Sequence, residues 1–175
     1  GGLGNDKLYG KEGNDSLLGG AGDDYFSGHD DDDLAYGGDG EDTLNGGNNN
    51  DKLYGELGND SLRGEAGDDT LEGGLGQDTV DGGTDNDILV VNYSSNIHDG
   101  IDSSVTNTTS GFSGNYSAYT DNNGNYDRID FSNIEQFDIT GTDVNDNVTT
   151  GNGDDTLNGG LGNDKLYGKE GNDSL

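Results

Sequence analysis

The chain has 175 residues, of which 37 are Asp or Glu and 7 are Lys or Arg, so its formal net charge is −30 at pH 7. Such acidity argues against nucleic acid and against anionic membrane surfaces as partners, because both require basic patches. No apolar run reaches the length of a membrane-spanning helix, about 18 residues. The absence of cysteine excludes disulfide bonds.

Residues 1–90 divide into ten consecutive segments of nine residues, beginning with GGLGNDKLY and GKEGNDSLL. In every segment the first residue is Gly and the eighth is apolar. The fourth is Gly in seven segments and otherwise Asp31, Asn49 or Asp85, residue types that tolerate a positive φ. We therefore expect a left-handed turn at the fourth position. The last three residues, such as KLY or TLN, suit a short strand with one inward side chain.

The sixth position is the most informative, because it is aspartate in all ten segments. The nine-residue pattern is lost over residues 91–140 and returns over residues 141–175, again with aspartate at the sixth position. We predict that these fourteen carboxylates are metal ligands: Asp6, Asp15, Asp24, Asp33, Asp42, Asp51, Asp60, Asp69, Asp78, Asp87, Asp146, Asp155, Asp164 and Asp173.

A chain this acidic and this poor in hydrophobic residues would ordinarily be disordered. One inward side chain per nine residues gives a thin core that does not offset the entropy of ordering the backbone. If segments two apart stack at about 4.8 Å, columns of carboxylates repel each other unless a cation separates them. Calcium prefers such hard oxygen ligands, whereas the lack of a recurring soft ligand disfavours zinc and copper.

The nine-residue pattern resembles the GGxGxDxUx motif of the RTX family, whose tandem copies bind calcium. The resemblance implies an all-β fold, a right-handed parallel β-roll or β-helix solenoid of stacked nonapeptide repeats, in which two segments form one coil. It also implies Ca²⁺ as the cofactor. The stacked pairs predict about ten ions, whose charge of about +20 would leave an ordinary residual charge.

The middle of the chain, residues 91–140, is predicted to be a β-rich insert without the repeat. Its end, residues 128–140, has spaced apolar residues and is expected to form strands that extend the roll and cap the start of the second array. Residues 91–127 suit either an irregular excursion or hairpins. The stretch 121–132 begins like an EF-hand loop, but Tyr126 and Ser132 stand where Gly and Glu are required, which disfavours a metal site there.

A longer repeat overlies the short one, because residues 159–175 are identical to residues 1–17. Their offset of 158 residues is not a multiple of nine, so the identity does not follow from the phase of the segments. It predicts a tandem unit of 158 residues, and we expect the chain to be part of a longer protein with array regions at 1–90 and 141–175.

Two functions fit these features. The first is a calcium-binding structural module of a secreted or cell-surface fibre, surface-layer or adhesin-like protein, with calcium ions and copies of itself as partners. The alternative is a C-terminal secretion and folding module of a toxin or hydrolase exported by type I secretion. Catalysis is not expected, because no HExxH occurs and GFSGN departs from GxSxG at Asn115.

Overall fold

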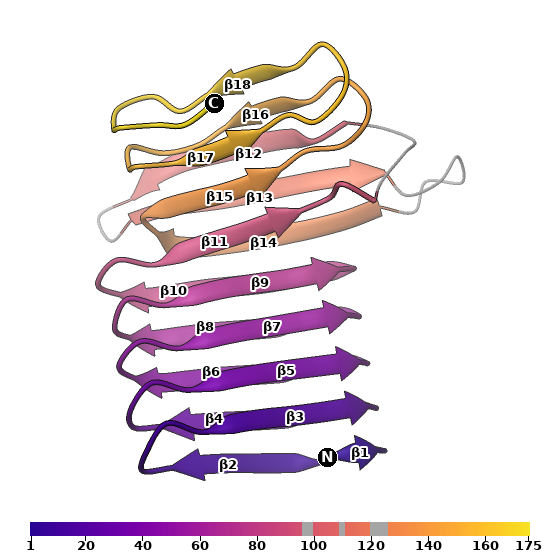
Figure 1. The fold of residues 1–175 in the computed structure, drawn as a ribbon, viewed down its shortest axis with the longest axis vertical. Coiled ribbons are helices and arrows are strands. Elements are labelled where there is room, and N and C mark those ends of the chain that lie inside the picture. Colours follow the sequence, from indigo (N-terminus) through magenta and orange to yellow (C-terminus); the bar gives the residue numbers. More distant parts are fainter. Residues whose placement is uncertain (96–99, 109–110, 120–125) are drawn as a thin grey trace.

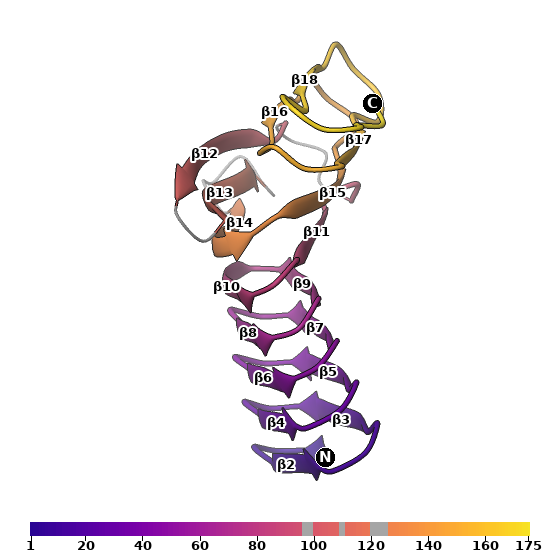
Figure 2. The same cartoon turned by 90° about the vertical axis from the view of Figure 1, so that its left-hand side faces the viewer.

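The computed structural model describes residues 1–95, 100–108, 111–119 and 126–175, and the regular elements within these ranges are all strands. The strands form two sheets that face each other along a rod, with the two termini at opposite ends (Figures 1 and 2). The predicted solenoid is therefore confirmed. No helix long and apolar enough to cross a membrane occurs among the described residues.

Alternate strands of the repeat build opposite sheets. The eight-stranded sheet contains, in spatial order, β1 (Gly2–Leu3), β3 (Ser16–Ala21), β5 (Leu34–Asp39), β7 (Lys52–Leu57), β9 (Thr70–Leu75), β11 (Ile88–Asn92), β15 (Gln136–Thr140) and β17 (Thr156–Asn158). The ten-stranded sheet contains β2 (Lys7–Lys11), β4 (Tyr25–His29), β6 (Thr43–Asn48), β8 (Ser61–Ala66), β10 (Gln77–Thr84), β14 (Tyr126–Ile134), β13 (Gly111–Tyr119), β12 (Asp102–Thr108), β16 (Asn147–Thr149) and β18 (Lys165–Tyr167).

One coil of the rod spans eighteen residues, as two nine-residue segments predict. Parallel pairing aligns residues eighteen apart, for example Leu44 with Leu62 in the ten-stranded sheet and Leu53 with Leu71 in the other. Each segment therefore lies directly against the segment two places along the chain. The resulting columns of identical positions place equivalent side chains one above another.

The core is the line of eighth-position side chains between the sheets. Leu44, Leu53, Leu62 and Leu71 are each at most 1% exposed, while the sheets' outer faces carry mainly polar residues. The middle segment thickens this core with aromatic rings: Phe131 lies 5.3 Å, centroid to centroid, from both Tyr116 and Phe137. The core is thus thinnest in the repeats, where a single apolar residue per segment fills it.

The middle segment joins the two arrays without breaking the sheets. Strand β14 pairs in parallel with β10, and β15 pairs in parallel with β11, so the strands expected at residues 128–140 are confirmed. Strands β12, β13 and β14 form an antiparallel meander that bulges from one side of the rod (Figure 2). Of the EF-hand-like stretch, residues 121–125 lie outside the described residues, and residues 126–132 belong to β14.

The turns use left-handed backbone at two positions, one of which the sequence analysis missed. Every fourth position of residues 1–90 has a positive φ, including Asp31 at 76° and Asn49 at 75°, which confirms the expected turn. Every second position there does as well, although several of these residues are not glycine: Lys11, His29, Glu56 and Glu65. Stacking against the coils on either side holds these residues in a conformation that L-amino acids otherwise avoid.

Two leucines, on the consecutive strands β7 and β8 of opposite sheets, test how much stability the thin core supplies. Leu62 is 1% exposed and Leu57 is 49% exposed. In saturating calcium, Leu62→Ala should lower the free energy of unfolding by about 2–5 kcal/mol, because it removes buried apolar contact and leaves a cavity. Leu57→Ala should cost well under half of that. Urea unfolding followed by circular dichroism gives both values, and equal losses would contradict a core confined to the eighth positions.

Candidate metal sites between the coils

In residues 1–90 the sixth-position aspartates form two ladders, one along each edge of the rod, and two further pairs lie in residues 141–175. In each ladder the backbone N–H of one aspartate donates to Oδ1 of the aspartate one coil later; Asp42 and Asp60 are joined in this way at 2.9 Å. The pairs are Asp6–Asp24, Asp15–Asp33, Asp24–Asp42, Asp33–Asp51, Asp42–Asp60, Asp51–Asp69, Asp60–Asp78, Asp69–Asp87, Asp146–Asp164 and Asp155–Asp173. The structure thus brings the predicted ligands together in the predicted order.

In ten of these carboxylates the other oxygen is buried and has no hydrogen-bond partner within the described residues. Asp51, Asp60 and Asp69 are each at most 2% exposed, and within the described chain their Oδ2 atoms have no hydrogen-bond partner. The same holds for Oδ2 of Asp15, Asp24, Asp33, Asp42, Asp78, Asp87 and Asp155. A buried carboxylate oxygen without a partner is costly, so these atoms mark where a cation would be bound.

Backbone oxygen atoms line the same spaces. A Cβ added to Gly55 would overlap both Oδ2 of Asp60 and the carbonyl oxygen of Gly73 in the next coil. The first-position glycine is therefore required, because any side chain would fill the space that these two oxygens share. Carboxylate and carbonyl oxygens are the donor set that Ca²⁺ uses, so the residues present fit calcium.

The electrostatics of the calcium-free roll favour neutralisation of these groups. Burial raises the pKa of Asp51, Asp60 and Asp87 to about 7, and the neighbouring carboxylates of the ladder act in the same direction. Burial also raises the pKa of Asp69 and Asp78, to about 6. At neutral pH the folded chain therefore needs either protons or a cation at these positions.

A separate set of hydrogen bonds between coils, which the sequence analysis missed, joins the fifth positions. The N–H of Gln77 donates to Oδ1 of Asn59, and the N–H of Asn86 donates to Oδ1 of Asp68, at 2.9 and 3.0 Å. These side chains reach toward the following coil, whereas the sixth-position carboxylates reach toward the preceding one. The available signal was that every fifth position in both arrays is Asn, Asp, Glu or Gln.

The first two segments of the second array depart from this geometry. Thr142 donates to both oxygens of Asp146, from its N–H to Oδ2 and from its hydroxyl to Oδ1. Thr150 replaces the first-position glycine, is fully buried, and donates its hydroxyl to the carbonyl oxygen of Tyr167 at 3.4 Å. Thr142 thus supplies hydrogen bonds to carboxylate oxygens that have no such partner in residues 1–90. Asp146 therefore fits calcium less well than the aspartates of residues 1–90.

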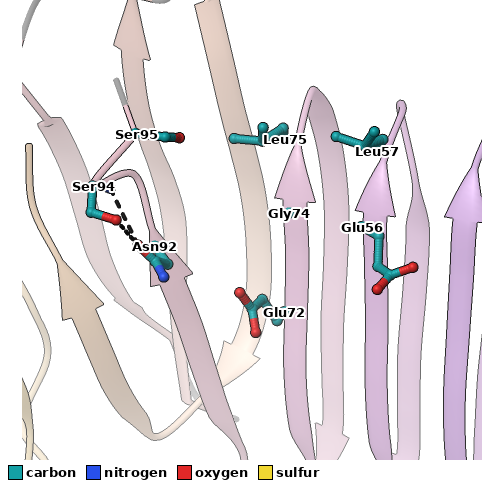
Figure 3. A pocket seen from close by; sticks show the side chains of 8 residues that line it. All are labelled: Glu56, Leu57, Glu72, Gly74, Leu75, Asn92, Ser94 and Ser95. Carbon is teal, nitrogen blue, oxygen red and sulfur yellow. Dashed lines mark hydrogen bonds between the residues drawn. The ribbon is translucent and has the colours of Figure 1, made fainter. Parts of the chain in front are cut away.

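Other groupings on the surface offer less. Among the described residues no cluster of three or more His, Cys, Asp or Glu side chains could hold a metal, so the sites depend on paired carboxylates and backbone oxygens. A depression over β7, β9 and β11 is lined by Glu56, Glu72 and Ser94, with Leu57 and Leu75 at its edge (Figure 3). Its lining contains no His, Cys or Lys and is open to solvent, and it gives no arrangement for covalent catalysis.

Coils joined by stacked, buried carboxylates define the class of calcium-binding β-rolls. The chain belongs to the RTX calcium-binding nonapeptide repeat family, which matches it at residues 1–35, 27–62, 54–89 and 140–175. A search of curated proteins found no match. Family membership supports calcium as the cofactor and a structural binding module as the role, while the fourteen individual ligands and the number of ions remain predictions.

Asp60→Asn tests a single rung of the ladder. The variant keeps the shape of the side chain and the acceptor for Asp42 N–H, but removes the charge. The calcium concentration at the folding midpoint, followed by circular dichroism, should rise by about tenfold, because a charged ligand is lost. Asp39→Asn is the matched control, since Asp39 is exposed on β5. Equal midpoints for the two variants would exclude Asp60 as a ligand.

The raised pKa values predict that acid partly replaces calcium. Between the unfolded pKa of about 3.9 and the folded values of about 6 to 7, the folded chain binds more protons than the unfolded chain. The calcium-free roll should therefore gain stability as the pH falls from about 8 to about 5. The measurement is circular dichroism of calcium-stripped protein in metal-free buffers, with a smaller gain expected for Asp60→Asn. Loss of structure on acidification over this range would contradict the prediction.

Proposed function

We propose that this chain is a calcium-rigidified structural module of an extracellular fibre, surface-layer or adhesin-like protein. The observation that carries the proposal is the ladder of buried, unpaired carboxylate oxygens, which repeats along both edges of the rod. An ion that binds only the folded state drives folding. Calcium at millimolar concentration outside the cell is in the range to which extracellular modules are tuned, so the rod would be flexible inside the cell and rigid outside.

The arrangement of the identical ends supports a tandem role. Residues 1–17 and 159–175 share one sequence, and their KLY strands, β2 and β18, are the two outermost strands of the ten-stranded sheet. The two antiparallel pairings at β12–β13 and β13–β14 cancel, so β18 runs in the same direction as β2. A following 158-residue unit would therefore continue both sheets in phase, even though 158 is not a multiple of eighteen.

The middle segment makes this continuation possible. Strands β12 to β15 absorb the residues that do not fit the coil period, and they return the chain to the same sheet and direction. In a pendant secretion and folding module, nothing requires the chain to return to the same sheet and strand direction. This favours the structural role over the alternative of a C-terminal module of an exported toxin or hydrolase.

The two roles predict different particles. Small-angle scattering and negative-stain microscopy of the chain should show a flexible, expanded polymer in excess chelator and a rod in ~2 mM calcium. The structural role predicts that the rods also associate end to end and lengthen with protein concentration. Monomeric rods at all concentrations would favour the secretion module, and a particle unchanged by chelation would refute the calcium mechanism itself.

A further inference from the structure

We infer that Glu135 completes an additional calcium site with Asp87, which no nonapeptide segment supplies. The inference rests on the proposed calcium-dependent folding. Glu135 extends the ladder along one edge of the rod by one carboxylate, from the repeats into the middle segment that lacks the nine-residue pattern.

The strand register places Glu135 at a sixth position. Ile88 of β11 pairs with Gln136 of β15, and Leu89 pairs with Phe137, so Glu135 is aligned with Asp87. The inter-coil hydrogen bonds agree, because Gln136 N–H donates to the carbonyl oxygen of Asp87 at 2.9 Å. One coil earlier, Ile88 N–H makes the equivalent bond to Asp69 at the same distance.

The carboxylate of Glu135 also accepts the hydrogen bond that joins successive aspartates of the ladder. The N–H of Asp87 donates to Oε2 of Glu135 at 2.9 Å, the length of the bond from Asp69 N–H to Oδ1 of Asp87. The longer glutamate side chain therefore reaches the place that an aspartate fills in each repeat. Glu135 is half-buried, and burial together with the nearby Asp85 raises its pKa.

A backbone oxygen completes the same surroundings. In the coil below, a Cβ added to Gly64 would overlap Oδ2 of Asp69 and the carbonyl oxygen of Gly82. A Cβ added to Gly82 would likewise approach Oδ2 of Asp87 and the carbonyl oxygen of Asn133. Asn133, near the end of β14, has a φ of 52°, so the backbone turns at the residue that presents the oxygen.

An independent observation points to a cation here rather than to a simple cap. Asp87 is 0% exposed, and its Oδ2 has no hydrogen-bond partner in the described part of the chain. Glu135 satisfies the N–H of Asp87 but brings a second negative charge beside this oxygen. Two adjacent carboxylates without a cation repel each other, so Glu135 increases the requirement for calcium.

The opposite edge of the rod ends differently. There the register aligns Asp78 with Ile129, which has no side-chain oxygen. The buried carboxylate of Asp127 lies nearby but is aligned with Gly76, whose N–H it accepts at 2.9 Å. Glu135 is therefore not a consequence of the general stacking of β14 and β15 on the array. The additional site belongs to one edge, where the segment from Asn133 to Glu135 replaces a whole nonapeptide loop.

The test counts ions and observes the carboxylate directly. In the wild-type chain labelled with ¹³C, calcium titration should shift the side-chain carboxyl resonances of Glu135 and Asp87 together. In native mass spectrometry at saturating calcium, Glu135→Gln should bind one ion fewer than wild type. Asp138→Asn is the matched control, because Asp138 is exposed on β15, the strand that directly follows Glu135, and its loss changes the net charge equally. The ion count of Asp138→Asn should stay at the wild-type value.

The outcomes separate this inference from the proposed function. If the Asp60 and Asp87 carboxyls shift while Glu135 does not, or if Glu135→Gln keeps the full ion count, the additional site is refuted and the calcium-dependent module stands. If no ladder carboxyl shifts and no ion is retained, the proposed function fails as well. The wild-type resonances decide the question even if Glu135→Gln does not fold, and Glu135→Asp, which keeps the charge on a shorter arm, should recover part of the affinity.

Discussion

The structure depends on the stacking of one carboxylate upon another at every coil. Asp60 shows the arrangement: one oxygen accepts the N–H of Asp42, and the other is buried against the Cα of Gly55 and the carbonyl oxygen of Gly73. This arrangement is unfavourable for a polypeptide alone, because it desolvates like charges and leaves acceptors unpaired. If calcium binds in the ladder, as we propose, the same atoms become links between coils. The proposal therefore makes the fold conditional on its ligand, through local chemistry that repeats along the rod.

Other features of the repeat follow from that constraint. The first position is glycine throughout residues 1–90 because a side chain would enter the space beside Oδ2. Thr150 is an exception in the second array, and its buried hydroxyl donates to the carbonyl oxygen of Tyr167. The second position, near the end of most strands of residues 16–84, and the fourth position, in the turn that follows, are both left-handed, and this backbone brings carbonyl oxygens back to the carboxylate. Few positions then remain for apolar residues, which explains why the core is a single column. In the proposed calcium-bound roll, the metal compensates for the hydrophobic surface that is missing.

Much of this could be predicted from sequence, because a strict period converts spacing into geometry. Gly, Asp and an apolar residue at fixed positions revealed the RTX resemblance, and that resemblance implied the eighteen-residue coil in which the carboxylates stack. The left-handed second position was missed because Lys11 and Glu56 give no local signal for it; neighbouring coils impose that conformation. Thr142 was missed as a partner of Asp146 because it stands at a position where the pattern gave no role to a hydroxyl group.

Glu135 illustrates where periodicity stops being informative. In a repeat, the carbonyl-bearing glycine and the aspartate are five positions apart. Asn133 and Glu135 are two positions apart, and the longer side chain of Glu135 reaches the same place. No search for the nine-residue pattern would align them. Their equivalence appears only once β15 is placed on β11, and the pairing of those strands depends on the buried side chains of Phe137 and Ile139. The hydrophobic register of the middle segment thus determines where the acidic ladder ends, which links the aromatic part of the core to the length of the proposed metal-binding edge.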